Sequence, residues 1–179
     1  MSTLQATTTK DSYAAVASEF ARKLAGKYMT FKLAEEIYGL EILKVRELIG
    51  FMQITRVPKA PEWFRGVLNL RGKVIPVVDL RLKFDMPRIE PTDQTVIIVV
   101  QYSLRARDVT MGILVDEVLE VLSIDAAQIE PPPALGIGAD ADFILAIGKA
   151  GERVLFLLDI GRILSEAETL EMEGAVAAD

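Results

Sequence analysis

The sequence predicts a mainly β protein built from two similar small lobes. Its apolar segments are mostly five to eight residues long, rich in β-branched side chains, and separated by glycine, proline or charged residues. This pattern is typical of small barrels rather than of a parallel sheet with long helices. Several segments also recur later in the chain. The 179 residues, 51% of them hydrophobic and 26% charged, fit a soluble globular protein of one domain or two small lobes.

The N-terminal part predicts a short helix followed by a hairpin. Residues 1–26 form an extension in which an amphipathic helix over 11–24 places four apolar side chains on one face, with Gly26 as a candidate stop. From Lys27 onward the side chains alternate with a period of two residues, as in a β-strand. Strands over 28–33 and 37–42, joined by a turn, are therefore expected.

Further strands follow along the chain, and helix caps mark their ends. The expected strands are 64–70, 73–78, 95–102, 109–115, 143–147 and 153–158. Arg71 and Gly72 form a tight turn between two of them. Asp79 and Asp159 each end a strand before a short apolar segment, which favours a role as helix N-caps. A capping box at 165–168 predicts a last helix from Glu166 towards Met172, within a C-terminal tail of residues 165–179.

An internal repeat indicates a duplicated lobe. Both glycines, both glutamates and the apolar spacing are retained between the two copies. The aligned pairs are 38–48 with 111–121, 53–54 with 128–129, and 74–80 with 154–160. We expect one lobe over about 27–90 and a second over about 91–164, with Met86 to Asp93 crossing between them. A chance match of short apolar strings is the alternative.

Composition excludes most catalytic chemistry. The chain has no cysteine and no histidine, so it has no disulfide, thiolate metal site, thiol nucleophile or histidine base. It lacks a phosphate-binding glycine loop. The carboxylate pairs Glu35-Glu36 and Asp116-Glu117 are sequence neighbours that a strand points to opposite faces, so they are poorly placed for acid–base work. We therefore expect no enzyme activity, no catalytic residue, no metal and no cofactor.

Nothing in the sequence predicts insertion into a membrane or export. The longest wholly apolar runs are about five residues, far below the ~20 that span a bilayer. Met1 to Lys10 is polar and has neither the cationic start nor the apolar centre of a secretory signal. A cytoplasmic location is expected.

Charge is distributed unevenly along the chain. Residues 1–90 carry 15 Lys and Arg against 10 Asp and Glu, whereas residues 91–179 carry 5 against 16. The basic excess concentrates between Ile54 and Arg88, which favours contact with nucleic acid or an acidic protein surface, or else a solvated face balanced by the acidic half. Trp63 and Phe64 in this stretch fit either base stacking or a strand entry packed into the core. The overall net charge of -6 argues against a tight phosphate binder.

Two equivalent segments carry more apolar side chains than a small lobe readily buries. Residues 43–49 and 115–122 alternate apolar groups with single charges. Exposed apolar groups rimmed by charge mark protein contacts, although about half of these side chains are expected in the core.

Several motifs resemble those of CheW-type chemotaxis coupling proteins. The most specific is the segment GVLNLRGKVIPVVDLR at 66–81, and the others are 28–33, 38–48, 54–58 and 129–133. The resemblance covers 27–164, so the extension and the tail have no implied role. It implies two five-stranded SH3-like β-barrel subdomains with short helices. It also implies a non-enzymatic adaptor, a monomer when isolated, that bridges the cytoplasmic tips of methyl-accepting chemoreceptors to the regulatory domain of the histidine kinase CheA. Binding of nucleic acid by a basic barrel face is the alternative function.

The resemblance also implies site residues. Those expected to bind receptor are Val45, Glu47, Leu48, Asn69, Arg71 and Val121, and those expected at a kinase or array interface are Gly66 and Val67. A guanidinium on a tight turn can form a bidentate pair with a carboxylate on a helical receptor tip, and Val45, Leu48 and Val121 would offer an apolar groove for that helix. Arg71 as an internal brace between lobes is the alternative.

Overall fold

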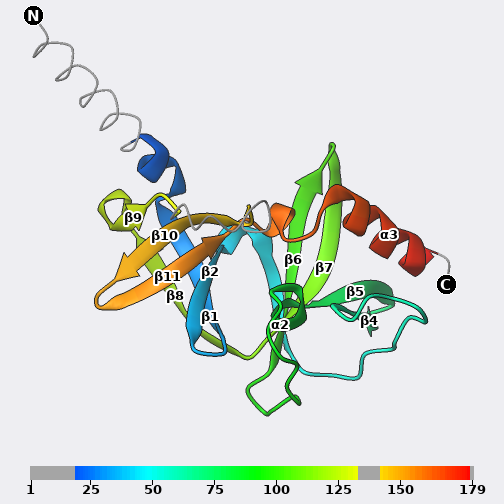
Figure 1. Ribbon diagram of the computed structural model, residues 1–179. Coiled ribbons are helices and arrows are strands. Elements are labelled where there is room, and N and C mark those ends of the chain that lie inside the picture. Colours follow the sequence, from blue (N-terminus) through cyan, green and yellow to red (C-terminus); the bar gives the residue numbers. More distant parts are fainter. Residues whose placement is uncertain (1–18, 133–141, 178–179) are drawn as a thin grey trace, which may run out of the picture.

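The computed structural model, which describes residues 19–132 and 142–177, consists mainly of two curled sheets (Figure 1). Sheet A has the strand order β8-β1-β2-β11-β10-β9, and sheet B has the order β3-β6-β7-β5-β4. The predicted mainly β class is confirmed. No helix in the described ranges is both long enough and apolar enough to cross a membrane.

The strands of sheet A are β1 (Gly26–Leu33), β2 (Glu36–Glu41), β8 (Glu117–Ile124), β9 (Ile129–Glu130), β10 (Ile144–Ala150) and β11 (Arg153–Leu158). Those of sheet B are β3 (Val45–Gly50), β4 (Phe64–Leu70), β5 (Lys73–Asp79), β6 (Val96–Leu104) and β7 (Arg107–Val115). The helical elements are η1 (Ile42–Lys44), α2 (Leu80–Lys83), η2 (Ala126–Gln128), η4 (Ile160–Arg162) and α3 (Glu166–Ala177). Residues 19–24 are also helical, and the remainder of the helix expected over 11–24 lies outside the described residues.

The internal repeat corresponds to equivalent strand pairings. β2 runs parallel to β11 with Gly39 opposite Leu157, and β7 runs parallel to β5 with Gly112 opposite Val77. Both glycines occupy crowded crossings, because a Cβ atom on Gly39 would lie 3.1 Å from Leu157 Cδ2 and one on Gly112 would lie 2.7 Å from Ile97 Cγ2. The same small residue is therefore required twice by the same packing, which favours duplication over a chance match.

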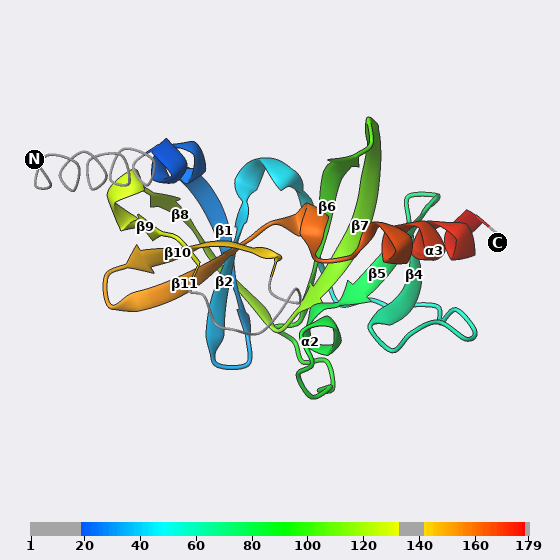
Figure 2. The same ribbon diagram turned by 45° about the horizontal axis from the view of Figure 1, so that its top comes forward.

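The sheets do not follow the expected division into lobes 27–90 and 91–164. The β1–β2 hairpin of the first half lies in sheet A between β8 and β11, and the β6–β7 hairpin of the second half lies in sheet B between β3 and β5. Each repeat thus completes the sheet of the other (Figure 2). Sequence periodicity locates strands but not their partners, and two equivalent hairpins fit either sheet.

The two segments expected to be rich in exposed apolar groups form β3 and β8, which lie at the edges of their sheets. In β3 the side chains alternate in burial: Val45 and Ile49 are half-buried, and Leu48 is exposed. These strands were not predicted because single charges interrupt them. The partial burial of both strands agrees with the expectation that only part of the apolar groups is buried.

The predicted helix caps are confirmed. Asp79 accepts a hydrogen bond from Leu82 N at 3.3 Å at the start of α2, and Asp159 accepts one from Gly161 N at 3.0 Å at η4. The capping box also forms: Glu168 N donates to the Ser165 hydroxyl, and Ser165 N donates to the Glu168 carboxylate. The helix that it starts continues to Ala177, beyond the expected end.

The main hydrophobic core is shared by both sheets. One buried cluster joins Phe31, Leu33 and Leu40 of sheet A to Ile98 and Met111 of sheet B. Two smaller clusters lie within the individual sheets. The sheets are therefore packed as one body around common apolar side chains.

Candidate protein-binding site

Sheet B curls so that its two edges, at β3 and β4, approach each other. Thr55, in the connection after β3, pairs with Val67 of β4, and two N–H···O bonds of 2.8 Å join their backbones. This approach requires glycine at position 66, where φ is +140° and a Cβ atom would lie 2.1 Å from Thr55 O. Closure brings the two edge strands of the sheet together and so positions the groups carried on them.

Gly66 and Val67, expected at a kinase or array interface, belong to this closure. The Val67 side chain is buried in the main core, and Gly66 packs against the Thr55 backbone. The Val67 side chain is therefore not presented to a partner. Both residues shape the surface from beneath it.

The β4–β5 turn presents Arg71. Arg71 and Gly72 have φ of 54° and 83°, which is the left-handed backbone that a two-residue type I′ hairpin turn requires. Asn69 Oδ1 accepts a hydrogen bond from Gly72 N at 2.8 Å and holds the turn in shape. Asn69 thus orients the turn that carries the arginine.

An exposed ion pair joins the turn to the opposite edge strand. Arg71 Nη2 contacts Glu47 Oε1 of β3, although the Arg71 side chain is 73% exposed and that of Glu47 is 28% exposed. A guanidinium has five N–H donors, so Arg71 keeps donors for a further carboxylate. Both residues belong to sheet B, so the pair joins two edges of one sheet and is not the brace between lobes given as the alternative, while the exposure of Arg71 leaves it accessible.

The remaining expected receptor residues are only partly brought together. Leu48, 42% exposed, lies on β3 beside Glu47, whereas Val45 packs against the core. Val121, 47% exposed, lies on β8 of sheet A. Glu47, Asn69 and Arg71 therefore form one cluster with Leu48 nearby. The expected groove of Val45, Leu48 and Val121 is not a single face of one sheet.

Sheet A carries an equivalent arrangement that the sequence analysis missed. Glu120 of β8, the repeat partner of Glu47, forms a 3.2 Å ion pair with Arg153 at the start of β11. Val121 occupies the position equivalent to Leu48, and exposed Val154 is equivalent to exposed Val74 of sheet B. The repeat itself was the available signal, because it retains both glutamates and aligns 74–80 with 154–160.

A second ion pair is much less exposed and links the sheets. Arg81 of α2 donates from Nε and Nη2 to the two carboxylate oxygens of Asp116, at 2.6 and 2.7 Å. Ala34 N, in the β1–β2 turn, donates to the same carboxylate at 2.8 Å. Burial acts to raise the pKa of Asp116, but the Arg81 and Ala34 hydrogen bonds and the Arg81 charge outweigh it, so the pKa lies below its ordinary value.

The basic stretch is half neutralised within the fold, because four of its eight Lys and Arg side chains are paired. Four of its cations form ion pairs: Arg65 with Asp79, Arg71 with Glu47, Arg81 with Asp116, and Lys83 with Glu168. The Lys83 ammonium also lies 4.9 Å from the centroid of the Trp63 ring, and Phe64 is buried. Trp63 and Phe64 thus follow the core interpretation rather than base stacking, which weakens the nucleic-acid alternative.

The described surface combines charged turns with exposed apolar side chains. Within residues 19–132 and 142–177, no group of three acidic, histidine or cysteine side chains is arranged to hold a metal ion. The exposed features are charged turns beside single apolar side chains. Fold and site together define a β-rich scaffold or adaptor protein.

Comparison with known proteins identifies the family. The CheW-like domain matches residues 27–168, and the chain therefore belongs to the CheW-like family of chemotaxis scaffold and coupling proteins. It is 39% identical to the chemotaxis protein CheW of Klebsiella aerogenes over 155 residues, which cover 86% of this chain and 91% of that protein. It is 34% identical to chemotaxis protein CheW of Bacillus subtilis, over 80% and 90% of the two chains.

A solved structure shares the fold. The crystal structure of the scaffolding protein TtCheW from Thermoanaerobacter tengcongensis is similar with a TM-score of 0.68 and 36% sequence identity. The similarity covers 76% of this chain and 90% of that chain.

Proposed function

We propose that this protein is a non-enzymatic adaptor that bridges the cytoplasmic tips of methyl-accepting chemoreceptors to the regulatory domain of the histidine kinase CheA. Membership of the CheW-like family supports the proposal. The observation that carries it is the exposed Arg71 turn, paired to Glu47 and flanked by exposed Leu48. In this proposal the protein is a cytoplasmic monomer when isolated and acts at membrane-associated receptor arrays.

The adaptor acts by holding its partners in a fixed relative geometry. An Arg71 guanidinium that already touches one carboxylate can bind another on a receptor helix, while Leu48 packs against that helix. Signal transfer then needs only a differential contact energy of ~1–3 kcal/mol between two array states. No bond is made or broken.

Arg71→Ala tests the proposal in co-sedimentation with receptor-containing membranes and CheA, with kinase activity as a second readout. We expect receptor association to weaken at least about tenfold, because a charge-assisted contact worth about 1.4 kcal/mol or more is lost. Unchanged association and unchanged kinase activation would contradict the assigned site.

Arg105→Ala is the matched control. Arg105 also lies in a two-residue hairpin turn, has a φ of 48°, is 79% exposed and pairs with one glutamate, Glu166, at 2.7 Å. The Arg105→Ala variant should bind receptors and kinase as the wild type does. An equal loss in both variants would point to general charge rather than to a specific Arg71 contact.

A further inference from the structure

We infer that a basic cavity beside sheet B binds a segment of a partner protein, and that this segment contains several carboxylates and an apolar side chain. The cavity of about 860 Å³ lies between the connection that follows β3, the start of β4 and α2. Its size lies within the ~300–1,000 Å³ typical of ligand pockets. It goes beyond the Arg71 site, because it recognises a second segment at a different place.

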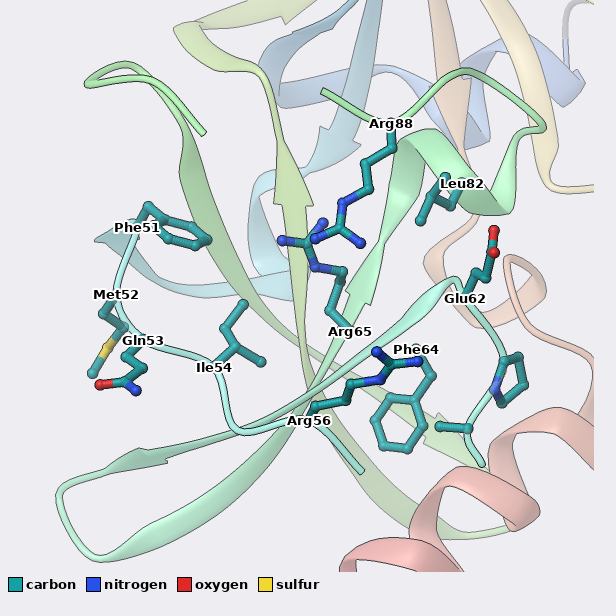
Figure 3. A pocket seen from close by; sticks show the side chains of 12 residues that line it. Phe51, Met52, Gln53, Ile54, Arg56, Glu62, Phe64, Arg65, Leu82 and Arg88 are labelled. Carbon is teal, nitrogen blue, oxygen red and sulfur yellow. The ribbon is translucent and has the colours of Figure 1, made fainter. Parts of the chain in front are cut away.

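Among the described residues that line this cavity, three are arginines and one is an acid. Arg56, Arg65 and Arg88 extend into the same hollow, with Glu62 at its rim (Figure 3). Arg65 is neutralised by buried Asp79 at 3.1 Å. Arg56 and Arg88 are exposed, so the cavity carries an uncompensated positive charge.

The unpaired state of these two arginines is unusual in this protein. Of the 11 arginines, all within the described ranges, Arg46, Arg56 and Arg88 alone have no ion pair, hydrogen bond or other electrostatic contact. Two of these three line the same cavity. Arginine is suited to bind carboxylates through two parallel N–H···O bonds, and two such groups favour an occupant with several carboxylates.

One wall of the cavity is apolar. Phe51 and Met52 are each 38% exposed, and Ile54 lies beside them (Figure 3). Large exposed apolar side chains next to arginine are typical of protein contact sites. This wall favours a peptide with an apolar side chain over a bare anion. Two unpaired arginines on a chain of net charge -6 are few for binding to nucleic acid.

The cavity and the Arg71 turn lie at opposite ends of β4. Arg65, the second residue of β4, lies at the cavity, and Arg71 follows the end of the strand, so the two are about 20 Å apart at ~3.3 Å per residue. Two partner segments can therefore be bound by one lobe at the same time.

Fluorescence anisotropy of the full chain tests this inference. The probe is a labelled heptapeptide of five acidic residues and two phenylalanines, compared with its glutamine and asparagine counterpart. We expect saturable binding of the acidic peptide alone, weakened at least about tenfold in the Arg56→Glu, Arg88→Glu double variant. Circular dichroism should show an intact fold, since both side chains are exposed.

Arg46→Glu is the matched control, because Arg46 is also exposed and unpaired but lies outside the cavity. It should change peptide affinity less than about twofold. Absent binding, equal binding of the neutral peptide, or equal weakening by Arg46→Glu would overturn the inference. If a single-stranded oligonucleotide bound more tightly than the acidic peptide, and the double variant lost that binding, the occupant of the cavity would be nucleic acid and the inference would be wrong. Arg71 is unchanged in all variants, so this outcome is separate from that of the proposed receptor site.

Discussion

Replacing Asp116 with asparagine should destabilise the protein by about 3 kcal/mol. Arg81 and Asp116 form a bidentate pair, and their side chains are only 13% and 18% exposed. Removing one charge from a buried pair leaves the other uncompensated, which costs about 3–5 kcal/mol, and the remaining exposure favours the lower end. Asparagine keeps the shape of the side chain, but its amide nitrogen is a donor and not an acceptor. Arg81 and Ala34 N both donate to Asp116, so one of their hydrogen bonds would be lost.

Urea unfolding followed by circular dichroism measures this loss. With a slope of about 2 kcal/mol per molar urea, the midpoint should fall by about 1.5 M. The pKa of Asp116 is below its ordinary value in the folded state, so its contribution is present at neutral pH and is lost as the pH falls through the acid range. The difference between Asp116→Asn and wild type should therefore shrink below about pH 4.

Arg105→Ala provides the stability control, because it breaks an ion pair that is 79% exposed on the arginine side. Such pairs contribute about 0–1 kcal/mol. A midpoint shift for Asp116→Asn as small as that of Arg105→Ala, or a difference from wild type that does not change with pH, would refute the buried-pair argument.

Two further variants test local packing. Gly66→Ala should lower stability by about 3 kcal/mol in thermal unfolding, because its Cβ atom would lie 2.1 Å from Thr55 O. Gly174→Ala is the control, since Gly174 has open space around it and its replacement should not lower stability. Equal melting temperatures of the two variants would argue against the closure. Burial and the charge of Glu41 raise the pKa of Tyr28 to about 12, so wild-type stability should fall as the pH rises above about 10. Tyr28→Phe should reduce that alkaline loss by about 2 kcal/mol, and an identical pH profile would contradict the burial argument.

Local features of the fold, including the β1–β2 and β4–β5 hairpins, were predictable from the sequence, and the placement of hairpins in the two sheets was not. The turn at Arg71 and Gly72 and the caps at Asp79 and Asp159 depend on neighbouring residues, and the structure confirms them. The exchange of hairpins depends on which equivalent partner the β1–β2 and β6–β7 hairpins meet. No periodicity encodes that choice, because both hairpins match both sheets.

The positions of the candidate site residues were predictable only where they depend on neighbouring residues in the sequence. Arg71 was assigned from its motif and is exposed on the turn as expected. Its pairing with Glu47, 24 residues away, depends on the closure between Thr55 and Val67, which brings opposite edges of sheet B together. Val67 is buried beside the same closure, so the sequence motif alone did not separate an exposed residue from a buried one.

The exchanged hairpins and the Asp116 carboxylate together explain how the lobes keep one relative orientation. Asp116 lies between β7 and β8, where the chain passes from sheet B to sheet A, and its N–H group donates to Lys32 O of β1 at 3.1 Å. Its carboxylate contacts Arg81 of α2 and Ala34 of the β1–β2 turn. Rotating one lobe against the other would break these contacts and also disturb the shared core. Under the proposed function, a partner bound at the Arg71 turn would engage both sheets as one body, which is the property that fixed-geometry coupling requires.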